Sequence, residues 1–410
     1  MTAAPAASSS VARNRLWARL NAAVAACSED LPTPLMVVDL DAFDANADDL
    51  VRRAGGKPVR VASKSLRVPA LVSRALTHDG FRGVLAYTLR EALWLHEHDV
   101  SDDVLVAYPT VDRGALVRLV ASPSAAARIT LMVDDEAHLD VVDSVRASHA
   151  VPVRVALDVD AGLWVSGRHV GPKRSPLHEV GPVVELARKV AARPGFRLVG
   201  AMTYEGQVAG LPDDVPGQRT RSAIVRRLKD ASMSQLSTRR RAIADALAQV
   251  ADLELWNAGG SGSVAESAAD PVVSEVTAGS GLLVPTLFDH YRSFEPRPAS
   301  YFGLPVTRRP APHVVTVHGG GLVASGAAGD ERLPTPWAPA GLQLSSLEGA
   351  GEVQTPLTGH ATGLLSIGDL VWFRHAKSGE PFEHTDTVRL LRGSELVDAV
   401  PTYRGLGLAF

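Results

Sequence analysis

The chain has 410 residues, of which 46% are hydrophobic, so it can bury a large core, and its length favours two domains. The formal net charge is -3 and the arginines are dispersed, which gives no electrostatic reason to expect a nucleic acid or an anionic membrane as partner. We therefore expect a small-molecule substrate. The single cysteine, Cys27, excludes an internal disulfide.

The N-terminal segment, residues 1–30, is predicted to be a tail followed by a short amphipathic helix over Arg13 to Ala26. It lacks the charged start and apolar run of a secretory signal, so we expect a cytoplasmic protein. An organelle transit segment is the alternative, because the start carries arginine and few acidic residues. No stretch approaches the roughly 20 apolar residues of a membrane helix.

Between residue 59 and about residue 280, short β-branched apolar runs alternate with longer segments of helical period, which is typical of repeated βα units. Eight such runs follow one another: VRVASK, GVLAYT, DVLVAY, ITLMVD, VRVALDVD, RLVGAMTYEG, LELWNAGG and SEVTAGSG. This α/β pattern predicts a (β/α)8 TIM-like barrel over residues 31–295, with an open doubly wound sheet as the alternative.

After Pro296 the helical period disappears and short alternating runs such as HVVTVHGG, DLVWFRHA and TVRLLRG follow. Together with the many Pro and Gly residues, they predict a C-terminal all-β domain over residues 296–410. The segment PLMVVDLDAF, which precedes the barrel, reads as one more strand. We expect these N-terminal residues to complete the β domain.

Lys64 is the one lysine, among six in the chain, that closes a predicted barrel strand. Functional side chains gather at the C-terminal ends of barrel strands, so this amine is placed to form a Schiff base. A solvated lysine that opens a loop is the alternative interpretation.

Two turns of small residues follow the last two predicted strands: NAGGSGS from Asn257 to Ser263, and EVTAGSG from Glu275 to Gly281. Their backbone N–H groups can form an anion nest, and consecutive strands seven and eight of a barrel often hold a phosphate. Each turn alone could be an ordinary tight βα turn. Together they favour a phosphate site.

The ordered segments TPLMVVDLDAFDAN, VASKSLRVP, MTYEGQ, NAGGSGS and EVTAGSG resemble the D-threonine aldolase and D-serine dehydratase-like family, over about Thr33 to Lys377. The resemblance implies a fold-type III enzyme that uses pyridoxal 5'-phosphate (PLP), with an alanine racemase-like N-terminal barrel, a C-terminal β domain and a homodimeric assembly. In such enzymes the cofactor supplies the electron sink, and the protein selects which substrate bond breaks.

The family pattern implies roles for individual residues of this chain. Lys64 matches the lysine that carries PLP, and Tyr204 the residue against the cofactor, with barrel packing as the alternative for Tyr204. The segment DVDAGLWVSGRHVG places His169, beside Arg168, where the family reaches the pyridine nitrogen; a surface Arg-His pair is the alternative. The residues that match the phosphate cradle are Gly259, Gly260, Ser261, Gly262, Gly279 and Ser280.

The segment WFRHAKSGE departs from the family. The family has a histidine and, two residues later, an aspartate or cysteine, which alternation on a strand puts on one face to bind a divalent metal. Here His375 matches the histidine, but Lys377 takes the second position. We predict no metal, with His375 and the Lys377 ammonium engaging the substrate's hydroxyl or a carboxylate. The alternatives are a buried Lys377 that acts as a base, a salt-bridged surface lysine, and a metal site using His375 with His384 or Glu380.

For the reaction, the resemblance implies a lyase that cleaves a D-3-hydroxy amino acid: His375 takes the hydroxyl proton, Cα–Cβ breaks, and glycine and an aldehyde form. The close alternative is a D-serine dehydratase-like reaction, in which Lys64 removes the α-proton and a 2-oxo acid and ammonia result. An amino-acid racemase needs a second base facing Lys64, and the C-terminal domain offers no clear tyrosine. A non-enzymatic PLP carrier is a further alternative.

Overall fold

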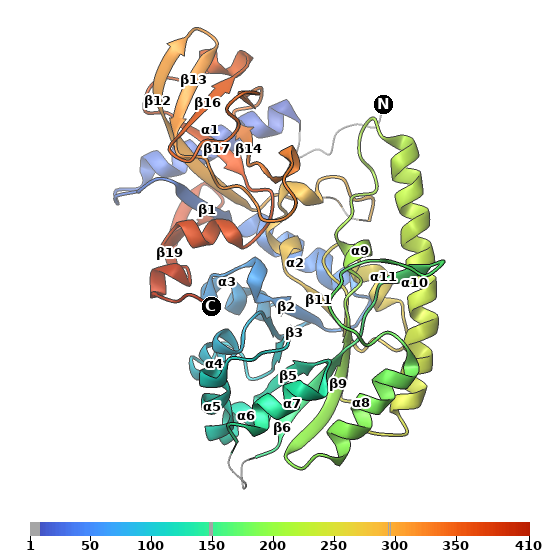
Figure 1. Ribbon diagram of the computed structural model, residues 1–410. Coiled ribbons are helices and arrows are strands. Elements are labelled where there is room, and N and C mark those ends of the chain that lie inside the picture. The colour runs from blue at the N-terminus through green and yellow to red at the C-terminus, as the bar shows by residue number, and fades with distance from the viewer. Residues whose placement is uncertain (1–8, 147–150, 294, 296) are drawn as a thin grey trace. The chain divides into compact units, whose positions relative to one another are not determined.

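The computed structural model describes residues 9–146, 151–293, 295 and 297–410 (Figure 1). It divides into two compact units. The barrel unit comprises Asp48–Lys64, Leu71–Gly279 and Phe410, and the β unit comprises Met1–Ala47, Ser65–Ala70 and Ser280–Ala409. The first eight residues of the predicted tail, and Pro296 at the predicted domain boundary, lie outside the described residues. The division along the chain falls between Gly279 and Ser280.

Eight parallel strands close into a barrel in the order β10-β11-β2-β3-β4-β5-β6-β9, which confirms the predicted fold class. Each of the eight predicted runs contributes one strand. The strands are β2 (Val59–Ala62), β3 (Phe81–Ala86), β4 (Val104–Val106), β5 (Ile129–Val133), β6 (Val153–Asp158), β9 (Phe196–Thr203), β10 (Leu255–Ala258) and β11 (Glu275–Ala278). Most are buried along their length, as expected for parallel strands covered on both faces.

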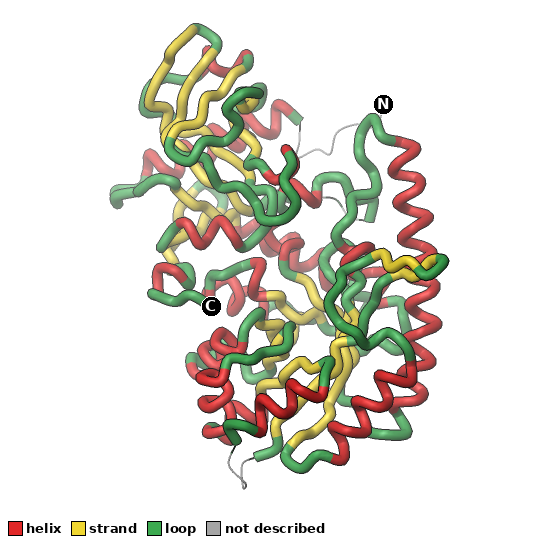
Figure 2. Tube along the Cα trace, viewed as in Figure 1, coloured by secondary structure: helices red, strands yellow, loops and turns green. Residues whose placement is uncertain are grey.

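Helices follow the barrel strands along the chain. Figure 2 shows helices in red beside the yellow strands. The helices are α3 (Pro69–Leu76), α4 (Leu89–Glu97), α5 (Arg113–Ala121), α6 (Pro123–Arg128), α7 (Glu136–Asp143), α8 (Val180–Ala192), α9 (Gly206–Ala209), α10 (Arg219–Leu247) and α11 (Val264–Ala268). Side-chain caps fix several starts: Thr88 accepts from Glu91 N at α4, and Asp112 from Ala115 N at α5.

A two-stranded antiparallel hairpin, β7 (Leu163–Val165) with β8 (Arg168–Val170), is inserted between β6 and α8. It contacts the long helix α10, because Gln235 exchanges hydrogen bonds of 2.9 Å with the backbone N and O of Trp164. The sequence DVDAGLWVSGRHVG therefore extends beyond the strand end as a hairpin.

The β unit contains a nine-stranded sheet in which β1 (Leu35–Asp39) pairs antiparallel with β12 and parallel with β18. The C-terminal region is thus rich in strands, as predicted. Its other strands are β12 (Ser300–Ala311), β13 (Val314–His318), β14 (Thr335–Ala338), β15 (Gln343–Leu344), β16 (Gln354–Thr358), β17 (Leu370–Arg374), β18 (Thr387–Arg392) and β19 (Glu395–Pro401). The unit also contains α12 (Ser280–Leu283) and the first part of α2 (Leu40–Arg53).

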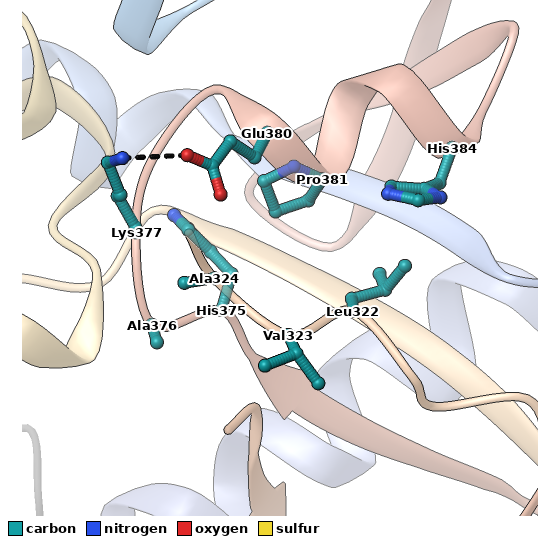
Figure 3. Close-up of a pocket in the computed structure, with 9 residues that line it drawn as sticks. All are labelled: Leu322, Val323, Ala324, His375, Ala376, Lys377, Glu380, Pro381 and His384. Atoms are coloured by element: carbon teal, nitrogen blue, oxygen red, sulfur yellow. Dashed lines mark hydrogen bonds and ion pairs between the residues drawn. The ribbon is translucent and has the colours of Figure 1, made fainter. Parts of the chain in front are cut away.

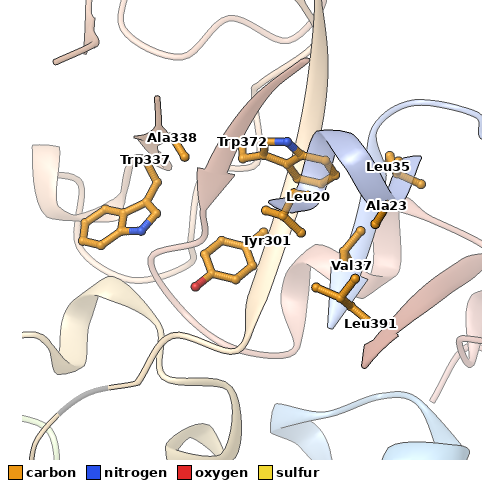
Figure 4. Packing of buried hydrophobic residues seen from close by; sticks show 9 residues of the cluster. All are labelled: Leu20, Ala23, Leu35, Val37, Tyr301, Trp337, Ala338, Trp372 and Leu391. Atoms are coloured by element: carbon orange, nitrogen blue, oxygen red, sulfur yellow. The ribbon is translucent and has the colours of Figure 1, made fainter. Parts of the chain in front are cut away.

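Helix α1 (Ser10–Ala26), which contains the predicted N-terminal helix, packs on this sheet through Leu20 and Ala23. Figure 4 shows these two side chains beside those of Trp372 and Tyr301 in one buried cluster. Hydrogen bonds fix the orientation: Trp372 Nε1 donates to Asn21 Oδ1 at 2.9 Å. In the part of the chain that the structure describes, no helix combines the length and apolar character of a membrane span.

Candidate functional site

Lys64 lies in a single 3-10 turn, Ser63–Ser65, that begins directly after β2. Its Nζ donates a hydrogen bond to the hydroxyl of Tyr108 at 2.8 Å and lies 5.5 Å from the centre of that ring. Burial raises the pKa of Tyr108, but the charge and hydrogen bond of Lys64 outweigh it, so the pKa is lowered overall. An amine and a phenol therefore face each other, joined by a hydrogen bond, at the ends of β2 and β4.

Tyr108 is a site residue that the sequence analysis missed. It ends the run DVLVAY two residues after β4, so its position at a strand end was the available signal. A tyrosine at the end of an apolar run is as easily interpreted as core packing.

A small pocket opens where β4, β6 and β9 end. The residues that line it are Tyr108, Asp158, Val159, Asp160, Ala161, Pro172, Arg174, Ser175, Met202 and Tyr204. Because the polar members follow the carboxyl ends of the strands, this is the mouth of the barrel at which such folds place their functional groups.

Asp158, the last residue of β6, is a buried carboxyl in this pocket. Its burial, together with repulsion from Asp134 and Asp160, raises its pKa to about 7, although Arg174 acts in the opposite direction. The carboxyl can therefore gain or lose a proton near neutral pH.

Arg174 is a second residue that sequence reasoning missed. Its guanidinium carbon lies 5.8 Å from the ring centre of Tyr108 and 5.7 Å from that of Tyr204, so it faces both aromatic rings of the pocket. It stands in an irregular stretch after β8. No pattern in the sequence distinguishes an arginine in such a stretch from an ordinary surface arginine.

His169 lies in strand β8, and its Nε2 is 3.1 Å from Asp160 Oδ1. The indole ring of Trp164 meets the histidine ring edge-on, with ring centres 5.1 Å apart. His169 does not line the mouth pocket described above, whereas Arg174 does. Contact of His169 with a pyridine nitrogen stays a prediction, and the structure adds Arg174 as another candidate for the same task.

Tyr204 directly follows β9 and lines the mouth pocket. Burial, reinforced by the neighbouring Glu205, raises its pKa to about 12, so the phenol stays neutral at physiological pH. Its ring borders the glycine turn after β10. An ideal Cβ built on Gly260 would lie 3.2 Å from Tyr204 Cε2 and 3.0 Å from Ala209 Cβ. A larger residue at this position would force the turn and the ring apart.

The two predicted small-residue turns meet in the barrel unit: Gly279 N donates to Ser261 Oγ at 3.3 Å. Gly259 has a φ of +89°, which L side chains rarely adopt. Arg53 holds the same turn from behind, since its Nη1 donates to Ser261 O at 3.0 Å. The turn from Gly259 to Gly262 therefore lies beside Gly279, and the binding of a phosphate there stays a prediction. Ser280, the next residue, begins α12 in the β unit.

His375 and Lys377 are not on a strand, which corrects the expectation that strand alternation puts them on one face. Strand β17 ends at Arg374, one residue before His375. His375 is buried, and its burial and the nearby Arg374 lower its pKa to about 3. Its Nε2 lies 3.2 Å from Ser378 Oγ. The chain turns away from the sheet at this point, so its side chains no longer alternate between two faces.

His375 and Lys377 nevertheless line one small pocket in the β unit, together with Glu380 and His384. Figure 3 shows Lys377 paired with Glu380 and, further along the pocket, His384. Lys377 Nζ donates to Glu380 Oε1 at 2.7 Å and to Ser325 Oγ at 2.6 Å. Partial burial raises the pKa of Glu380, but the hydrogen bonds from Lys377 and Ser325 and the charge of Lys377 outweigh it and lower the pKa to about 2. Among the described side chains, no cluster of three or more His, Cys, Asp or Glu has the geometry to hold a metal.

The fold and the mouth define the class: a (β/α)8 barrel with an amine at the end of one strand and a glycine cradle at the ends of two others. The family model described as "Alanine racemase, N-terminal domain" matches residues 38–284. The chain therefore belongs to the alanine racemase N-terminal domain family.

Among curated proteins, a 3-hydroxy-D-aspartate aldolase of Paracoccus denitrificans is 25% identical over 182 residues, which cover 44% of each chain. The match spans about half the length of such relatives or less. Among solved structures, D-threonine aldolase from Filomicrobium marinum has a TM-score of 0.76 at 21% identity, covering 91% of this chain and 95% of the other. D-threo-3-hydroxyaspartate dehydratase from Delftia sp. HT23 has a TM-score of 0.69 at 18% identity, covering 91% and 97%. These two likenesses show the fold.

Proposed function

We propose that this protein is a PLP-dependent lyase that cleaves a D-3-hydroxy amino acid by a retro-aldol reaction, and that it needs no metal. The observation that carries the proposal is the arrangement at the barrel mouth, where the Lys64 amine, two tyrosines and a glycine turn lie at strand ends. The chain also belongs to the alanine racemase N-terminal domain family. The aldolase name of the curated relatives supports the choice of reaction.

The residues at the mouth fit PLP. Lys64 would hold the aldehyde carbon covalently, because its amine is at the end of a strand and is oriented by a hydrogen bond of 2.8 Å to the hydroxyl of Tyr108. The turn from Gly259 to Gly262 would hold the phosphate, since it consists of small residues that expose backbone, and a Cβ at Gly260 would crowd Tyr204 and Ala209. When bound, PLP supplies the electron sink that makes cleavage of a bond at the substrate's α-carbon possible.

The protein's own groups at the mouth then divide the remaining tasks. Tyr204 stays a neutral phenol and supplies a flat face to an aromatic ring. Arg174 supplies a permanent positive charge for a carboxylate or a ring oxygen. Asp158, with a pKa of about 7, can donate or accept a proton at its carboxyl near neutral pH.

For the hydroxyl proton, the proposal keeps His375, on the strength of the sequence resemblance. With its pKa lowered to about 3, this imidazole is neutral at physiological pH, so a ring nitrogen can accept a hydrogen bond from the substrate hydroxyl, and proton transfer to it requires the bound substrate to raise that pKa. The ammonium of Lys377, held by Glu380, takes the place of a metal-binding side chain and would hold an oxygen anion by charge. The protein is further proposed to act as a homodimer in the cytoplasm.

The test is a substrate screen of the PLP-loaded protein. D-threonine, D-3-hydroxyaspartate and D-serine, with their L-enantiomers as controls, are incubated with and without a chelator, and glycine and 2-oxo acids are measured separately. The proposal expects glycine and an aldehyde from a D-3-hydroxy substrate at a rate that the chelator leaves unchanged. A 2-oxo acid and ammonia would instead identify a dehydratase. Recovery of the opposite enantiomer would identify a racemase, and an unresponsive cofactor spectrum a PLP carrier.

A further inference from the structure

Glu205 is a fully buried carboxylate that directly follows Tyr204 at the end of β9. Its Oε2 accepts a hydrogen bond of 2.9 Å from Nη2 of Arg240, an equally buried residue of helix α10. Arg240 is fixed in turn, because its Nε donates to Thr203 Oγ1 at 2.9 Å. Removing two charges from water costs free energy, so a buried ion pair is by itself weak evidence that it stabilises the fold. The other contacts of Glu205 indicate a further role.

The other oxygen of Glu205 points to the turn after β10. Oε1 accepts from Ser263 Oγ at 2.6 Å and from Ser267 Oγ at 2.5 Å. The Ser263 hydroxyl also accepts a bond of 3.1 Å from the backbone N–H of Gly260. A hydroxyl has one proton, so donating it to Glu205 leaves the oxygen lone pairs of Ser263 for Gly260. Glu205 thereby fixes the peptide orientation of the glycine turn through one intermediate side chain.

Ser267 provides an internal contrast. It donates to the same carboxylate oxygen as Ser263, but the hydrogen bonds of the described residues give it no link to Gly260. Removing the Ser267 hydroxyl therefore takes one partner from Glu205 but leaves the hydrogen bonds from Glu205 through Ser263 to Gly260 intact. Removing the Ser263 hydroxyl breaks both of those hydrogen bonds.

We infer that Glu205, held by Arg240, is a positioning residue that acts through Ser263 to set the geometry in which the Gly259–Gly262 turn binds a phosphate group. The inference rests on the proposed function, because the phosphate is that of PLP. It is independent of which substrate is cleaved and of whether a metal takes part.

The variant Glu205→Gln removes one negative charge beside the turn. Its effect on phosphate binding has opposite signs if Glu205 acts by its charge and if it acts by holding Ser263 in place. If the carboxylate acted on the phosphate through its charge, the variant would bind phosphate more tightly. If it acts through position, the variant binds more weakly, since the amide cannot both accept from the two serines and face Arg240 with an acceptor. The sign of the change in affinity separates the two explanations.

The experiment measures dissociation constants of PLP and of pyridoxal, which lacks the phosphate, by absorbance titration of cofactor-free protein. We expect Ser263→Ala and Glu205→Gln to weaken PLP binding by about tenfold, the loss of one well-made hydrogen bond, and pyridoxal binding by less than about twofold. Ser267→Ala should change both by less than about twofold. Asp103→Asn, in the Arg60–Asp103 ion pair at the other end of the barrel strands, is the control for a general loss of stability and should behave like Ser267→Ala.

The inference is overturned if Ser263→Ala and Ser267→Ala act alike, if PLP and pyridoxal weaken together, or if Glu205→Gln tightens PLP binding. Because Glu205→Gln can impair folding, the serine pair decides alone when that variant is insoluble. Wild-type protein that binds no PLP would contradict the proposed function and this inference together. Wild-type protein that binds PLP, with the two serine variants equal, would contradict the inference alone.

Discussion

Two buried Arg-carboxylate networks lie at opposite ends of the barrel strands, and they have different partners. At the strand starts, Arg60 in β2 pairs with Glu275 at 2.7 Å and with Asp103 at 2.9 Å. At the strand ends, Arg240 pairs with Glu205 at 2.9 Å and with Asp270 at 3.3 Å, and Glu205 shares its other oxygen with two serine hydroxyls. The first network continues to side chains of the strands themselves, Asn257 and Thr277, whereas the second continues through Ser263 to the backbone of the glycine turn. Both arginines are buried, so burial does not distinguish the two networks. We expect the one at the carboxyl ends of the strands, where functional groups gather, to serve the site and the other to serve stability.

The largest expected effect is at the strand ends. Lys64→Ala should lower the rate of amino-acid cleavage by about 10³-fold or more while the protein stays folded, because the amine that would carry the cofactor is lost. Lys189→Ala, at a half-exposed lysine on α8, is the matched control. Steady-state rates and circular dichroism check both variants. Near-normal activity of the Lys64→Ala protein would show that the barrel mouth is not the catalytic site.

The strand starts should respond in stability instead. Arg60→Met leaves Glu275 and Asp103 without their common partner, and breaking a buried pair of this kind costs about 3–5 kcal/mol in the free energy of unfolding. Urea denaturation measures the loss, and the PLP dissociation constant of the folded fraction should stay unchanged. If PLP affinity falls in step with stability, the two ends of the barrel are not separate in function.

The mouth should also show a pH dependence that Asp158 creates. Its pKa is raised to about 7 in the folded protein, so the neutral carboxyl is favoured there. The associated stability is fully present below the ordinary carboxyl pKa of about 4 and is lost as the pH rises toward 7. Relative to Asp158→Asn, the cofactor-free wild-type protein should therefore lose about 1–3 kcal/mol between pH 5 and pH 8.

Urea unfolding at the two pH values checks this prediction, with the exposed Asp102→Asn as control. A difference between wild type and Asp158→Asn that stays constant with pH would show that Asp158 is already ionised at pH 5. In that case the carboxyl could not donate a proton near neutral pH.

The smallest effect on stability is expected for a third ion pair, Lys377–Glu380 of the β unit, which is partly exposed. The Lys377 side chain is 44% exposed, so Lys377→Met should change the free energy of unfolding by less than about 1 kcal/mol. Activity should nevertheless fall by about tenfold if the ammonium holds a substrate oxygen. Glu380→Gln is the matched variant, and equal, small losses of activity in both would reduce the pair to a surface salt bridge.

The sequence was sufficient to predict what depends on local pattern. Eight apolar runs predicted the eight strands, and their ends located Lys64 and the two small-residue turns. Contacts between distant segments could not be predicted this way. Arg240 on α10 reaches Glu205 across 35 positions of sequence, and nothing in the helix pattern distinguishes it from the exposed arginines nearby. Likewise, the end of β17 at Arg374 depends on a turn that the alternating pattern of WFRHAKSGE hides.

The most direct test of the account is chemical tagging of the proposed cofactor site. Protein loaded with PLP is reduced with borohydride, digested and analysed by mass spectrometry. We expect the pyridoxyl group on the peptide that contains Lys64 and on none of the other five lysines. A tag at another lysine, or a protein that takes up no cofactor, would contradict it.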